Sequence, residues 1–101
     1  MIVRDASVQI QHGKEAEAIA ILKEIVAYTE PRWPTPVPRQ VSVDIGGEWG
    51  RVHLIVVRES LAEHDRHQAE QNADGTYQAL AQRFFALMIP GSGRTALRRV
   101  V

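Results

Sequence analysis

The apolar residues of this chain recur with two different periods. From Ile2 to Ile10 every second residue is apolar except Arg4, and the residues between are mostly polar. This period of two predicts a β-strand with one apolar face and one mostly polar face. From Lys14 to Thr29 the apolar residues are spaced three and four apart, which predicts an amphipathic helix. The helix should end at or before Glu30, because Pro31 disfavours a helical residue ahead of it.

The middle of the chain predicts a hairpin. Four prolines within residues 31–38 favour an extended, semi-rigid connector. Gln40–Ile45 alternates between polar and apolar residues, which predicts a second strand, and Gly46–Gly50 supplies the glycines of a turn. A third strand follows within Gly50–Leu61 and is apolar at almost every position. A strand that is apolar on both faces must be covered on both faces.

The second half of the chain predicts a helix with a break. Ser60 and Glu63 fit a capping box, which marks the start of a helix. Asn72–Gly75 is poor helical sequence, so the helix should break or bend there. It resumes through an apolar stripe from Tyr77 to Met88, and Pro90–Gly93 ends it.

A last short strand at Thr95–Val101 completes the order strand, helix, strand, strand, helix, strand. This βαββαβ order fits an α+β fold of ferredoxin-like topology. In it, an antiparallel four-stranded sheet has both helices on one face and the first and third strands in the centre. We expect residues 1–101 to form a single domain. A chain of that length buries roughly 65% of the surface of its unfolded form, enough for one core.

The sheet face opposite the helices needs a cover. It would carry Asp5, Ser7 and Gln9 beside one of the two apolar rows of the third strand, and the periodicity leaves open which row. Such a mixture is too apolar to face water and too polar for a sealed core. We therefore predict a homodimer whose two sheets pack face to face around a small cavity. The two possible rows are Val52, Leu54 and Val56, or His53, Ile55 and Val57.

Charge and composition exclude several classes of function. Twelve basic residues balance twelve acidic ones, so no net positive field would attract nucleic acid or an anionic membrane surface. The local basic cluster of Arg94, Arg98 and Arg99 fits a solvated strand edge. Without cysteine the chain has no disulfide framework, thiol nucleophile or thiolate metal site. No segment reads as a signal peptide or a membrane span, which favours a cytoplasmic protein.

Four short motifs in the second half resemble those of a known superfamily. They are Gly-Arg-Val-His-Leu-Ile-Val at 50–56, Ser-Leu-Ala-Glu at 60–63, Asp-Gly-Thr-Tyr-Gln-Ala-Leu at 74–80 and Pro-Gly-Ser at 90–92. From about Gly46 to Val101 the chain resembles the dimeric α/β barrel superfamily, and most of all its NIPSNAP-related bacterial members. The resemblance implies a ferredoxin-like homodimer. The superfamily also includes cofactor-independent monooxygenases, haem-binding degraders and isomerase-like enzymes, and no catalytic signature here selects one of them.

His53 is the candidate catalytic residue. A neutral imidazole in a central strand can donate through one nitrogen and accept through the other. With Asp5, Ser7 or Gln9 close by, it could act as a general base or orient a substrate oxygen. The simpler interpretation, which a lone histidine favours, is a half-buried side chain hydrogen-bonded across the sheet. His64 and His67 have the spacing of a metal-binding helix face, but no third ligand is evident, and we expect neither a metal nor a cofactor.

The remaining candidate binding residues are the two tryptophans. Trp33 and Trp49 lie in the proline segment and the hairpin, where each could cap a cavity or stack on a flat ligand, or simply cover the end of the core. Two classes of function stay open. One is a module that binds a small, partly apolar molecule. The other is a cofactor-independent monooxygenase or isomerase-like enzyme that uses His53 and a polar residue of the first strand.

Overall fold

The computed structural model describes all residues, 1–101, and the order of its elements is the one predicted, with the second helix divided in two. Each strand and helix lies where the corresponding pattern was found. The elements are β1 (Ile2–Gln9), α1 (Glu15–Arg32), β2 (Gln40–Val43), β3 (Arg51–Arg58), α2 (Leu61–Asn72), α3 (Gly75–Phe85) and β4 (Arg94–Arg99).

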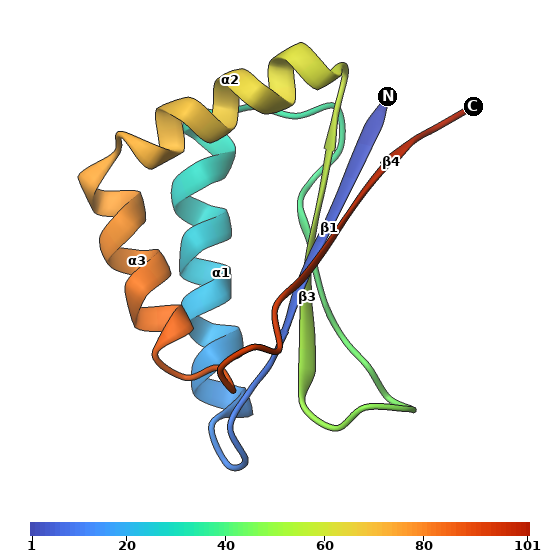
Figure 1. Ribbon diagram of the computed structural model, residues 1–101. Helices are drawn as coiled ribbons and strands as arrows, with labels where there is room; N and C mark the ends of the chain where they lie inside the picture. The colour runs from blue at the N-terminus through green and yellow to red at the C-terminus, as the bar shows by residue number, and fades with distance from the viewer.

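The four strands form one antiparallel sheet in the order β2-β3-β1-β4. This arrangement confirms the predicted ferredoxin-like fold with β1 and β3 in the centre. All three helices lie on one side of the sheet, with α2 across one end of the α1–α3 pair, and the other side carries no helix (Figure 1).

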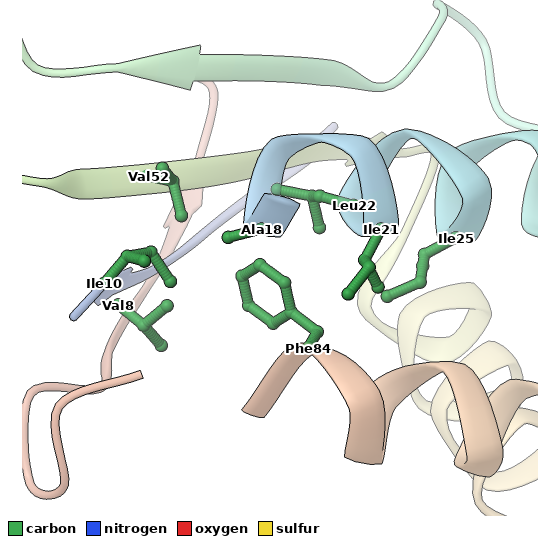
Figure 2. Packing of buried hydrophobic residues seen from close by; sticks show 8 residues of the cluster. All are labelled: Val8, Ile10, Ala18, Ile21, Leu22, Ile25, Val52 and Phe84. Atoms are coloured by element: carbon green, nitrogen blue, oxygen red, sulfur yellow. The ribbon is translucent and has the colours of Figure 1, made fainter. Parts of the chain in front are cut away.

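The core decides which row of β3 faces the helices. Val8 and Ile10 of the first strand segment and Val52 of β3 pack together with α1 and with Phe84 of α3 (Figure 2). Because side chains alternate across a strand, Leu54 and Val56 share the face of Val52. The row of His53, Ile55 and Val57 therefore lies on the open face, the sheet face without helices.

The predicted helix break is present. α2 ends at Asn72 and α3 begins at Gly75. Asp74 caps α3 by accepting a hydrogen bond of 2.8 Å from the Tyr77 backbone N–H, and it also accepts from the Tyr28 hydroxyl at 2.9 Å. The break therefore re-aims the stripe that continues through Tyr77 and Phe84 onto the core.

Two local predictions were wrong in detail. α1 continues through Pro31 to Arg32, because the proline lies in the last turn and the carbonyl at Ala27, which its missing N–H would have bonded, is at an exposed position. At Ser60 only half of the capping box forms. The Ser60 hydroxyl accepts from the Glu63 N–H at 3.1 Å, but the Glu63 carboxylate pairs with His67 instead.

None of the helices is both long and apolar enough to span a bilayer.

Candidate functional site

A pocket of about 210 Å³ lies between the sheet and the helices. Eleven of its 16 lining residues are hydrophobic, so most of its wall offers only dispersion contacts. Ala6 and Leu54 form its floor on the sheet, Ile25 of α1 contributes to the wall, and Ala81 and Phe84 of α3 line it as well.

Polar side chains also line this pocket, namely those of Arg4, Ser7, Tyr77, Arg94 and Thr95. Arg4 lies on the same face of β1 as Ala6 and Val8, and Tyr77 lies in the first turn of α3. Arg4 is the residue that interrupts the apolar row of the first strand. The sequence pattern shows this exception but does not indicate what Arg4 does. None of the proposed site residues except Ser7 borders this pocket.

A second polar site lies on the open face, around His53. Its Nδ1 is 2.8 Å from an Asp5 carboxylate oxygen and its Nε2 is 2.9 Å from an Asp44 carboxylate oxygen. The contact with Asp5 was among those expected from the sequence, whereas Asp44 was not anticipated. The two carboxylates fix the orientation of the ring, which is 19% exposed.

The two carboxylates also control the charge of His53. Burial alone would lower the pKa of His53, but the hydrogen bonds and negative charges of Asp5 and Asp44 outweigh it and raise the pKa above 6.5. Between pH 6.5 and the raised pKa, the folded chain holds a proton that the unfolded chain has released. The resulting stabilisation is complete below pH 6.5 and is lost as the pH rises through the folded-state pKa.

We therefore expect His53→Gln to remove a pH-dependent part of the stability. The difference in unfolding free energy between wild type and variant should be constant below pH 6.5 and should shrink above it, by at most about 1.4 kcal/mol per pH unit. Urea unfolding at fixed protein concentration over about pH 5.5–9 measures this difference. His12→Gln, at an exposed histidine, is the control. A difference that stays constant over the whole range would contradict the assigned ion pairs.

The other two proposed polar residues of β1 belong to a neighbouring network. The Ser7 hydroxyl accepts a 2.9 Å hydrogen bond from the buried guanidinium of Arg51, and the side-chain amide of Gln9 donates to the Trp49 carbonyl at 2.8 Å. Arg51 also forms an ion pair with Glu48 at 2.6 Å. Ser7 and Gln9 therefore lie on the same face as His53 but have other partners.

The two tryptophans have different environments. Trp33 is buried and packs edge to face against Tyr28 and Tyr77, with ring centroids 6.4 and 6.3 Å away. Trp49 is 66% exposed and donates from Nε1 to Glu15 at 3.1 Å. Neither borders the pocket, so a role for either in ligand binding stays a prediction.

The two helical histidines have different environments. His67 is buried and its Nδ1 accepts a 3.0 Å hydrogen bond from Nε of Arg58, whereas Nδ1 of His64 lies 3.1 Å from the Asp65 carboxylate. No group of three or more His, Cys, Asp or Glu side chains in the structure is arranged to hold a metal ion.

The comparisons with known proteins identify relatives of the fold. No protein-family model and no curated protein matches the sequence. A NIPSNAP family protein from Agrobacterium tumefaciens matches with a TM-score of 0.83 and 20% identity, over 99% of this chain and 92% of that one. An uncharacterized NIPSNAP domain protein from Burkholderia xenovorans matches with a TM-score of 0.80 and 13% identity, over 100% and 95% of the two chains.

A cofactor-independent oxygenase from Streptomyces nogalater also matches, with a TM-score of 0.73 and 16% identity, over 98% of this chain and 91% of that one. At these identities the likeness shows the fold. The chain shares its ferredoxin-like fold with NIPSNAP and antibiotic biosynthesis monooxygenase proteins, which confirms, at the level of the fold, the resemblance found in residues 46–101.

Proposed function

We propose that this protein binds a small, partly apolar molecule in the pocket between its sheet and helices. The observation that carries the proposal is the pocket itself, about 210 Å³ in volume and lined by eleven hydrophobic residues. An apolar cavity of roughly 150 Å³ holds a benzene molecule. The pocket is therefore large enough for one aromatic ring with a short substituent, or for an aliphatic chain of similar size.

We propose further that the protein acts as a homodimer joined through the open face. Val3, Ile55 and Val57 form an apolar patch on the two central strands of that face, toward the start of β1, and Val3 and Val57 are paired in the register of β1 and β3. No helix of the chain covers the patch (Figure 1). The ion pairs of Asp5 with His53 and Arg98 lie beside it. A second copy of the sheet would cover this patch and, in a stable dimer, bury more than roughly 1,000 Å² in total.

Filling the pocket should weaken binding. Ala81 of α3 lines the pocket, and Ala79, two residues earlier on the same helix, is exposed and does not. We expect wild type and Ala79→Phe to bind the neutral probe 2-phenylethanol equally, and Ala81→Phe to bind it at least about tenfold more weakly, because the new ring occupies the space. NMR titration of the methyl resonances measures the affinities. No binding to the wild type, or undiminished binding to Ala81→Phe, would refute the proposal.

The second candidate is a cofactor-independent monooxygenase or isomerase-like enzyme that uses His53. It is favoured by the contact of both ring nitrogens with carboxylates, at 2.8 and 2.9 Å, which holds the imidazole in one orientation and stabilises its charged form. The charged ring is an acid. To act as a base toward a substrate it must first release one proton, and the carboxylate beside the freed nitrogen must move away. The fold shared with the Streptomyces nogalater oxygenase agrees with this candidate. His53→Gln should then preserve the fold and lower turnover of an identified substrate.

A further inference from the structure

Three arginines lie at one end of the sheet, on the face that the helices cover. Arg58 ends β3 opposite Ile2 in the register of β1, and Arg4 lies two residues further along β1, opposite Val56. Arg39 immediately precedes β2 and is buried against the proline segment. Each lowers the free energy of any anion placed near it.

None of these three guanidinium groups has a carboxylate partner in the chain. The ion pairs that arginines form in this structure involve other residues, namely Arg51, Arg66, Arg83, Arg94 and Arg98. Glu30 accepts from the backbone N–H of Arg39 and not from its side chain. Glu63, whose charge acts on Arg58, pairs with His67 and Arg66.

Two of the three are also buried. Arg58 is 2% exposed and Arg39 is 7% exposed. Arg58 donates from Nε to His67, and Arg39 donates to the Trp33 carbonyl at 2.7 Å. In both guanidinium groups the Nη1 nitrogen is buried and has no hydrogen-bond acceptor. A buried charge without a counterion is costly, so this arrangement is unfavourable unless something negative offsets it.

The neighbouring acids offset only part of that charge. Glu30 acts on Arg39 and Glu63 acts on Arg58, but neither carboxylate pairs with a guanidinium of the cluster. Burial, followed by the charges of Arg39 and Arg4, lowers the pKa of Arg58 to about 10, which leaves it cationic near neutral pH. Burial and the charge of Arg58 lower the pKa of His67, so that histidine is neutral. The end of the sheet therefore has an excess of positive charge.

The pocket and the arginine cluster meet at Arg4 and Tyr77. Both residues line the pocket. Tyr77 also lies near enough to Arg39 and Arg58 to offset part of the lowering of their pKa values by burial. We propose that the ligand of the pocket carries a carboxylate that binds the Arg4 guanidinium, with Arg39 and Arg58 behind it supplying positive potential. This inference rests on the proposed function and specifies the chemistry of the ligand.

A carboxylate fits better than a phosphate for two reasons. A planar carboxylate can accept two parallel hydrogen bonds from a single guanidinium. Arg4 is the only clustered arginine that borders the pocket, and Arg94, which also borders it, is paired with Glu48. A dianionic phosphate would need further unpaired cations in contact. Most of the remaining wall is hydrophobic, so most of the rest of the ligand should be hydrocarbon.

The test compares phenylacetate with 2-phenylethanol, which have the same ring and chain length and differ in the charged group. In the wild type, phenylacetate should bind tighter by roughly tenfold to a hundredfold, as a charge-assisted hydrogen bond provides. In Arg4→Met that preference should disappear while the affinity for 2-phenylethanol is unchanged. Arg94→Met is the matched control, because Arg94 also borders the pocket but pairs with Glu48 at 3.5 Å.

The outcomes separate this inference from the proposed function. Equal binding of the two probes by the wild type, or a preference that survives in Arg4→Met, would overturn the carboxylate site and leave the pocket intact. Loss of the preference in Arg94→Met but not in Arg4→Met would overturn the assignment to Arg4. If neither probe binds the wild type, the proposed pocket function fails as well.

Discussion

Leu54→Asp should unfold the chain. Leu54 lies on the helix-covered face of central strand β3, lines the pocket and packs against the core cluster. A carboxylate there must be desolvated without a partner or become protonated, which costs several kcal/mol. Single domains are stable by only about 5–15 kcal/mol. We expect loss of the cooperative urea transition, or a strongly lowered midpoint, measured by far-UV circular dichroism.

The matched control is Leu97→Asp on edge strand β4. Leu97 is 46% exposed, so a carboxylate there stays hydrated and should change the stability by only about 0.5 kcal/mol. An unchanged urea midpoint in Leu54→Asp would contradict the assignment of Leu54 to the covered face.

Ile55→Asp, one residue further on, should separate the subunits and leave each one folded. Ile55 lies on the open face, opposite Asp5 of β1 and Gln40 of β2. In a single chain the new carboxylate can reach water. In the proposed dimer it would be enclosed near Asp5, and the cost of several kcal/mol would raise the dimer dissociation constant by at least about a hundredfold.

Light scattering at micromolar concentration distinguishes the two states. The wild type should have the mass of two chains and Ile55→Asp the mass of one, with the same circular dichroism spectrum. A monomeric wild type would refute the dimer, and a dimeric Ile55→Asp would place the interface on another surface. A variant that unfolds would show that Ile55 is needed for the fold of the single chain.

The order and type of the elements could be predicted because each depends on a local pattern. Alternating residues in β1 and β2 and the helical spacing of α1 are visible in short windows. Gly47 and Gly50 have φ of +81° and +73°, as a glycine turn between β2 and β3 requires. Asp74 marks the start of α3 because its short side chain caps the helix.

The orientation of β3 could not be predicted because both of its rows are apolar. Whether Leu54 or Ile55 faces the helices depends on the register with β1, and the pairing of Ala6 with Leu54 settles it. The predicted end of α1 was wrong for a different reason. Proline disfavours a helical residue before it but does not forbid one, and Pro31 is an exposed residue in the last turn of α1.

The polar sites show the same limit. The contact of His53 with Asp5 could be expected because both lie in central strands, whereas Asp44 comes from a hairpin loop whose geometry the sequence does not specify. The burial of Arg39 and Arg58 depends on how the proline segment and α2 fold back onto the sheet, where Arg39 meets the Trp33 carbonyl and Arg58 meets His67. No periodic pattern in the sequence specifies that packing. Arg4, as a charged residue in an apolar row of β1, is the one member of the cluster of Arg4, Arg39 and Arg58 that the local pattern singles out.

A crystal structure grown with phenylacetate tests the central claim most directly. We expect one probe molecule between Leu54 and Phe84, with its carboxylate toward Arg4, in a protein whose open faces pack against each other. A pocket closed by its own side chains, or a probe bound only elsewhere on the molecule, would contradict the claim that this pocket is the binding site.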